Sequence, residues 1–96
     1  MNLRDALALK HFKVVVDGTD VTLRRPSVAD LASAATLGSD INIPAWLVFN
    51  HLLADNGTQY FSSIEEVLSC DGKFVELIAD QCEKLYGEGR DSTAQH

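Results

Sequence analysis

The chain has few of the residues on which disulfide, metal and catalytic sites depend. Its 96 residues include two cysteines and three histidines. Cys70 and Cys82 are too few and too far apart for a disulfide scaffold or a four-ligand zinc site, so we expect two reduced thiols. His51 has one possible second ligand nearby, Asp55, four residues later. Two ligands do not make a structural zinc site, which favours surface hydrogen bonding as the role of His51.

The acidic residues and glycines are not spaced as in a catalytic centre. Glu65 and Glu66 are adjacent, so on a helix they point about 100° apart and cannot flank one bond. Cys70 has no flanking motif that would bring a base to it, as covalent catalysis requires. The six glycines are scattered and form no phosphate-binding loop. The sequence therefore predicts a protein that is not an enzyme and that binds no metal or cofactor.

Long apolar runs are also missing. No stretch reaches the roughly 18 apolar residues that a membrane span requires. The first ten residues lack the uninterrupted apolar core and the small-residue cleavage site of a signal peptide. We therefore expect the protein to stay in the cytoplasm of the cell that makes it.

Positive charge is scarce and unevenly distributed. Eight Lys and Arg face fourteen Asp and Glu, for a net charge of −6, yet residues 1–26 alone carry a net +2. An acidic surface repels a phosphate backbone, so nucleic-acid binding is disfavoured. The exception is a basic patch that Lys13, Arg24 and Arg25 are expected to form. We expect this patch to contact an acidic surface of another subunit, although solvated strand residues would explain it equally well.

What the chain does have is the composition of one small globular domain. It is 46% hydrophobic and 23% charged, which argues against disorder over most of its length. We expect one domain over residues 1–87, with residues 1–10 as a loosely docked helix. Residues 88–96 include a single apolar residue, an alanine, and should form a flexible polar tail.

A β-hairpin leading into a capped helix is the clearest local pattern. Apolar residues alternate in a strand over 11–16, and a second strand over 20–25 follows Asp17-Gly18, a pair that favours the positive φ angles of a tight turn. Pro26 ends the second strand, and Ser27 is a good helix N-cap. We expect the outer edges of the hairpin to be unpaired.

Apolar periodicity and breaking residues predict the helices that follow. They indicate helices over 28–37 and 44–54, a helix of at most two turns after Ser62-Ser63, and a last helix that Asp71 caps and Gly87 ends. The predicted fold is α+β, with one β-hairpin packed against a small bundle of about four helices. The residues expected to be largely buried are Trp46, Phe49, Leu53, Leu77 and Ile78.

The helix over 44–54 is apolar around most of its circumference, and this allows two interpretations. It is either a central core helix wrapped by the others or a helix that also serves a protein interface. In the second case Trp46 and Phe49 join Lys13, Arg24 and Arg25 as candidate protein-binding residues. The open hairpin edge and this helix are then the places where self-association is expected.

The order of these elements resembles the tail assembly chaperones of long, noncontractile-tailed bacteriophages. The resemblance covers about residues 10–87 and depends on three stretches: residues 21–31, residues 55–68 and the closing Leu85-Tyr86-Gly87. These are patterns of turns and apolar positions that contain no catalytic residue. Net negative charge and an apolar surface suit a protein that keeps an aggregation-prone partner soluble.

The resemblance implies a late protein that acts in the cytoplasm of the infected host and is absent from the mature virion. Its implied partners are the tape-measure protein, which it coats, and the tail-tube protein, whose subunits it helps to recruit. Family members tend to oligomerise, and many also exist in a longer form made by ribosomal frameshifting near the end of the reading frame.

An acidic phage inhibitor or DNA mimic that binds a host enzyme is the alternative. Such a protein needs carboxylates in rows at phosphate-like spacing. The eleven acidic residues after residue 26 are instead spread over several expected helix faces. A pull-down with a tape-measure protein separates the two hypotheses.

Overall fold

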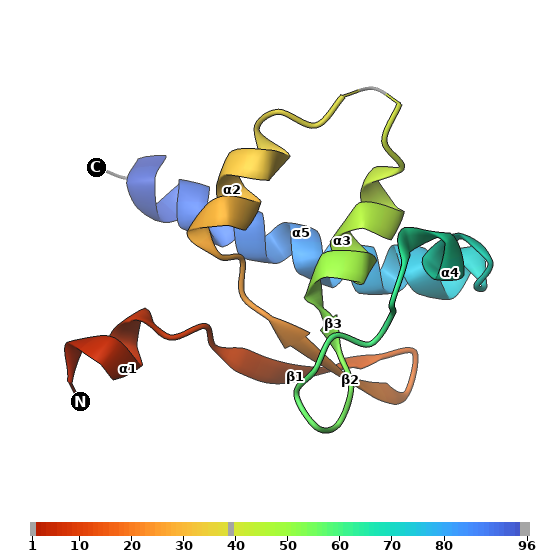
Figure 1. The fold of residues 1–96 in the computed structure, drawn as a ribbon, viewed down its shortest axis with the longest axis horizontal. Helices are drawn as coiled ribbons and strands as arrows, with labels where there is room; N and C mark the ends of the chain where they lie inside the picture. The colour runs from red at the N-terminus through yellow and green to blue at the C-terminus, as the bar shows by residue number, and fades with distance from the viewer. Residues whose placement is uncertain (1, 39, 95–96) are drawn as a thin grey trace.

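A three-stranded antiparallel sheet and five helices make up the described part of the fold (Figure 1). The structure is a computed structural model that describes the backbone of residues 2–38 and 40–94 and the side chains as far as Gly87. Helix α1 (Leu3–Leu7) precedes the hairpin of β1 (His11–Val16) and β2 (Thr19–Arg24). The predicted α+β class, a hairpin packed against helices, is confirmed.

The hairpin forms as the sequence predicts. Asp17 and Gly18 have φ angles of 50° and 79°, so both adopt the left-handed conformation of a two-residue turn. The register pairs Val14 with Val21 and Val16 with Thr19. Side chains at alternate positions of β1, ending at the buried Val16, face the helices, and those between them are exposed.

A third strand was not predicted, and the expectation that both outer edges of the hairpin are unpaired is wrong. Helix α3 (Ile43–His51) ends three residues before the predicted position, and β3 (Leu52–Leu53) pairs with Thr22 and Leu23 of β2. The chain then returns through a turn in which Gly57 has a φ of 86°, and Leu53 bridges to Gln59. β1 is left as one edge of the sheet.

Polar side chains near the first residue of a helix cap its free backbone N–H groups. Ser27 and Asp30 form a reciprocal capping box at α2 (Val28–Ala34), and Asn42 accepts a hydrogen bond from the Ala45 N–H at α3. At the start of α4 (Ile64–Leu68) the Glu66 carboxylate accepts a hydrogen bond from the Ser63 N–H. As predicted, Asp71 caps the last helix, because its carboxylate accepts a hydrogen bond from the Phe74 N–H.

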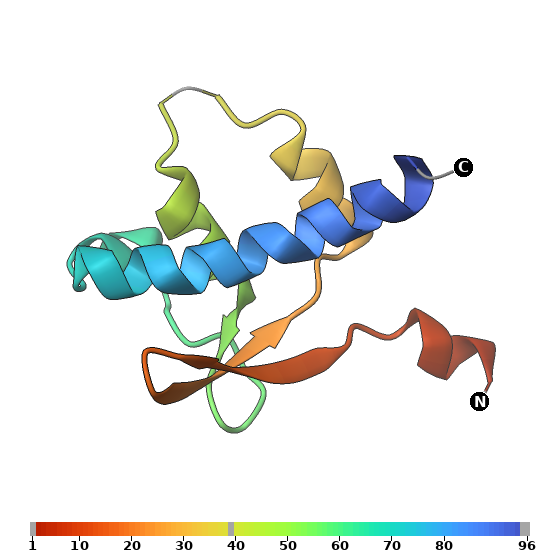
Figure 2. The same cartoon turned by 180° about the vertical axis from the view of Figure 1, so that it is seen from behind.

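The last helix, α5 (Gly72–Ala94), runs beyond Gly87, so the prediction that Gly87 ends the helix is wrong. The backbone of residues 88–94, expected to belong to a flexible tail, continues the helix. Residues 95 and 96 of the expected tail lie outside the described residues. Seen from behind, α5 crosses the whole molecule in front of α3 (Figure 2).

The core lies between the sheet, α3 and α5. The best-buried residues of these elements are Leu23, Val48, His51 and Cys82, each no more than 1% exposed. Among the residues expected in the core, Leu53 and Ile78 are buried, whereas Trp46, Phe49 and Leu77 are only half-buried and pack against its periphery. The apolar side of α2 is exposed, with Val28 85% and Leu31 50% accessible.

None of the helices in the described residues combines the length and the apolar character needed to cross a membrane.

Candidate protein-binding site

A pocket of about 490 Å³ lies between the first half of β2, α3, the segment that follows β3, and the start of α5. Its floor and walls are largely apolar. The lining residues of this kind are Val21, Val48, Leu52, Leu53, Phe61, Phe74, Val75 and Ile78. Pockets of about 300 to 1,000 Å³ lined by apolar side chains are typical of binding sites.

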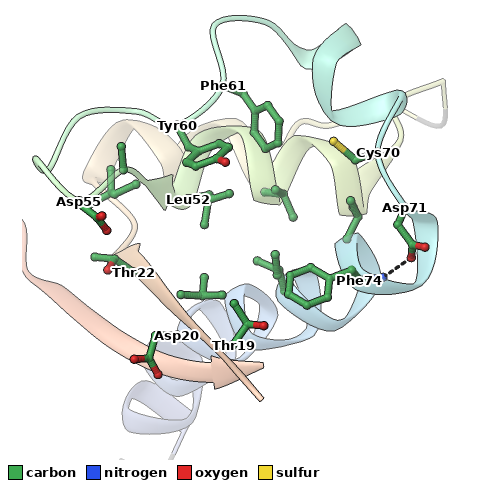
Figure 3. A pocket seen from close by; sticks show the side chains of 16 residues that line it. Thr19, Asp20, Thr22, Leu52, Asp55, Tyr60, Phe61, Cys70, Asp71 and Phe74 are labelled. Carbon is green, nitrogen blue, oxygen red and sulfur yellow. Dashed lines mark hydrogen bonds between the residues drawn. The ribbon is translucent and has the colours of Figure 1, made fainter. Parts of the chain in front are cut away.

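Carboxylates stand at both ends of this hollow, which we call the acid-rimmed pocket. Figure 3 shows Asp55 at one end and Asp71 at the other, with Leu52, Phe61 and Phe74 around the space between them. Asp20 also borders the pocket, although strand alternation turns its side chain to the opposite face of β2 from the buried Val21. All three aspartates are exposed. Tyr60 borders the pocket and is 59% exposed, so its ring is available to a partner. The arrangement suits an apolar segment that carries basic residues on either side.

Different local features build the two ends of the pocket. Asp20 is the second residue of β2 and pairs with Val15 of β1, so the hairpin register sets its position. Asp55 lies in the return after β3, where the Ala54 N–H donates to the Thr58 carbonyl at 2.8 Å. Asp71 is held by its hydrogen bond to the start of α5, 3.0 Å from the Phe74 nitrogen. Three separate segments of the chain therefore supply the rim.

Arg24, one of the expected basic-patch residues, is tied to the fold. Its guanidinium donates to the Asp30 carboxylate at 2.5 Å, and the two side chains are 19% and 12% exposed. Burial by itself would raise the pKa of Asp30, but hydrogen bonds from Arg24 and from the Ser27 N–H outweigh it and lower the pKa. The pair therefore anchors the start of α2 to the end of β2.

His51 occupies a buried polar position and not the surface position that the sequence favoured. Its ring is fully buried, with Nδ1 3.0 Å from the Arg24 carbonyl and Nε2 2.7 Å from the Tyr86 hydroxyl. Because a carbonyl only accepts hydrogen bonds, the neutral ring carries its proton on Nδ1, and Nε2 accepts a hydrogen bond from the Tyr86 hydroxyl. Helix α3 ends at His51, so Asp55 is not its neighbour on a helix.

Burial has the largest effect on the ionisation of both partners of this hydrogen bond. Burial lowers the pKa of His51, because the charged imidazolium would lose its hydration. Burial also raises the pKa of the Tyr86 hydroxyl. Both side chains are therefore neutral at pH 7, which suits a structural contact between α3, β2 and α5.

The candidate residues from the sequence do not converge on one site. Lys13 and Arg25 are exposed, whereas Arg24 is paired with Asp30. Trp46 and Phe49 lie on α3, half-buried against the core. The lining of the acid-rimmed pocket contains none of the five, so their role in protein binding stays a prediction.

No sequence pattern indicated the acid-rimmed pocket. Asp20, Asp55 and Asp71 looked like ordinary turn and cap residues, and apolar residues on four different segments line the space between them. The sequence did indicate a chain reversal at Asp55-Asn56-Gly57 and ring side chains at Tyr60 and Phe61. Their position follows from the unpredicted strand β3, because the Tyr60 N–H donates to the Leu52 carbonyl and Gln59 bridges to Leu53.

No group of three or more His, Cys, Asp or Glu residues in the described part of the chain lies close enough to hold a metal ion. Cys70 is exposed and Cys82 buried, and both thiols are free. Comparisons of the chain with protein-family models, with curated proteins and with solved structures find no match.

Proposed function

We propose that the protein is a tail assembly chaperone of a long-tailed, noncontractile phage. In this function it binds the tape-measure protein in the host cytoplasm and helps to recruit tail-tube subunits, without a catalytic step. The acid-rimmed pocket carries the proposal. It offers a chaperone an apolar surface for one segment of an aggregation-prone partner, while the acidic exterior keeps the complex soluble.

The chemistry of the pocket defines the segment that it would bind. Apolar side chains of the partner would enter between Leu52, Phe61 and Phe74, and Lys or Arg on either side would meet the aspartates at the two ends. The apolar contacts would supply most of the affinity, because exposed ion pairs contribute little. The rim charges would steer association and set the orientation of the segment.

Binding to the tape-measure protein encoded in the same genome tests the proposal. Tyr60→Ser removes an exposed ring at the pocket, and we expect it to weaken binding about tenfold, as loss of an interface aromatic does. Asp20→Asn with Asp55→Asn should slow association, most at low salt, where charges are least screened. The matched control is Glu65→Gln with Asp80→Asn, which removes two exposed charges outside the pocket.

Circular dichroism spectra should show that each variant is folded before its binding is compared with that of the wild-type protein. Wild-type protein that does not capture the tape-measure protein would reject the function. Capture that survives both pocket variants unchanged would reject the pocket as the binding site. A gene position beside those of the tail-tube and tape-measure proteins would be independent support.

A further inference from the structure

Helix α1 is formed but buries no residue. The Asn2 carboxamide accepts a hydrogen bond from the Asp5 N–H at 2.9 Å, and the Lys10 ammonium donates to the Asp5 carbonyl at 2.9 Å. Leu3 and Leu7, one turn apart on the same side, are 74% and 75% exposed. A helix of five residues is marginal in water unless it packs against something. Its apolar side therefore lacks a partner within the described fold.

The acid-rimmed pocket matches this side of α1 in chemistry. Arg4 and Lys10 lie on either side of Leu7 in the sequence, and the pocket has aspartates at its two ends with apolar residues between them. The charges agree, since residues 1–10 carry Arg4 and Lys10 against Asp5, whereas the pocket lining contains three aspartates and no Lys or Arg. Apolar surface and charge are thus both complementary between α1 and the pocket.

A chain cannot place α1 in its own pocket while the sheet is intact. The pocket is lined by residues 19–22, which pair with residues 13–16 at the turn end of the hairpin, whereas α1 precedes the other end of β1. Three residues join α1 to β1 and reach at most about 10 Å, and a strand of six residues is about 20 Å long. Figure 1 and Figure 2 both show α1 far from the hairpin turn.

We propose that α1 of one copy occupies the acid-rimmed pocket of a second copy and competes there with the tape-measure segment. The inference rests on the proposed function, because it concerns the same pocket. Helix and pocket are different surfaces of one chain, so the contact is heterologous and continues head to tail from copy to copy. Each occupied pocket would have its apolar lining covered until the tape-measure protein displaces α1.

Disulfide trapping tests the contact directly, because the pocket already contains an exposed thiol. Cys70 lines the pocket, and Cys82 is 0% exposed and so is protected from reagents. Leu7→Cys treated with diamide should give a ladder of dimers, trimers and larger species, with residues 7 and 70 joined in the peptide map. Val15→Cys is the control, since residue 15 is also well exposed, on β1.

Two results of the trapping would overturn the inference. One is a disulfide ladder that forms equally well from Val15→Cys. The other is Leu7→Cys linked only to a second residue 7, which indicates a symmetric dimer. Adding Cys70→Ser to Leu7→Cys should remove the ladder.

Sedimentation then separates this inference from the proposed function. Leu3→Ser with Leu7→Ser should weaken self-association about tenfold or more, whereas Val28→Ser with Leu31→Ser, which alters an equally exposed apolar side on α2, should change it less than about twofold. The α1 variant should also bind the tape-measure protein more tightly, because the competing helix is disabled.

The two proposals can fail separately in this experiment. Unchanged association of the α1 variant, or a wild-type chain that stays monomeric at every concentration, overturns the inference even if the tape-measure protein binds. A monomeric α1 variant that does not bind the tape-measure protein supports the contact between α1 and the pocket, but it rejects the proposed function and with it the competition.

Discussion

His51 accepts a hydrogen bond from Tyr86 across 35 residues of sequence, with 2.7 Å between Nε2 and the phenolic oxygen. The two rings meet edge to face, with their centroids 5.4 Å apart. On the other side of the imidazole, Nδ1 reaches the carbonyl of Arg24, whose own side chain binds Asp30. One buried histidine thus connects α3 to α5 and to the end of β2.

Tyr86→Phe should lower the free energy of unfolding by about 1 to 3 kcal/mol. The change removes only the hydroxyl and leaves the fully buried Nε2 of His51 without a donor. Urea denaturation measures the loss. Tyr60→Phe is the matched control, because that ring is 59% exposed and should change stability by less than about 0.5 kcal/mol. Equal effects of the two variants would contradict the buried hydrogen bond.

Stability should fall as the pH drops through the range just below 6.5, the ordinary pKa of histidine. Burial lowers the pKa of His51 in the folded state, so in this range the unfolded chain binds the extra proton first and gains free energy. Asp30 affects stability in a more acidic range, because its pKa in the folded protein is lower than the ordinary value of 3.8. Its ionised carboxylate stabilises the fold above pH 3.8, and this contribution is lost as the pH falls through the pKa of Asp30 in the folded protein. An NMR titration of the His51 ring checks the first effect, and a midpoint at or above 6.5 would contradict it.

Arg24→Glu should lower the free energy of unfolding much more than Arg25→Glu, although the two arginines are neighbours with the same charge. Arg24→Glu places a carboxylate beside Asp30 and should cost about 3 kcal/mol, the low end for breaking a buried ion pair, because both side chains keep some exposure. Arg25 is exposed, and its reversal should cost less than about 0.5 kcal/mol. Thermal melts monitored by circular dichroism compare the two. A stable Arg24→Glu protein would show that the ion pair does not anchor α2.

Ile78→Ala should destabilise the protein more than Leu77→Ala. Ile78 is 4% exposed and belongs to the core between α3 and α5, so its truncation should cost about 2 to 5 kcal/mol through lost burial and a cavity. Leu77 is half-buried at the periphery and should cost less. Urea melts of the two variants rank the positions. The reverse order would mean that α5 is rotated relative to the sheet.

Features that depend on neighbouring residues could be predicted from the sequence. The turn at Asp17-Gly18, the Ser27 N-cap and the Asp71 cap each involve residues at most three apart. Their backbone preferences and hydrogen bonds act locally, so they form in the same way in most surroundings. The α+β class follows from these signals together with the apolar periodicity.

Tertiary structure decided the features on which the proposed function depends. Strand β3 exists because Leu52 and Leu53 pair with β2, about 30 residues earlier in the chain, although their apolar pattern also fits the end of a helix. That pairing holds Leu52 and Leu53 against β2, and the return segment in turn pairs with β3, so that both line the acid-rimmed pocket. Likewise, Arg24 looks like a free surface cation until the fold places Asp30 beside it. Local propensity alone could not select these arrangements, because their stability depends on contacts between distant segments.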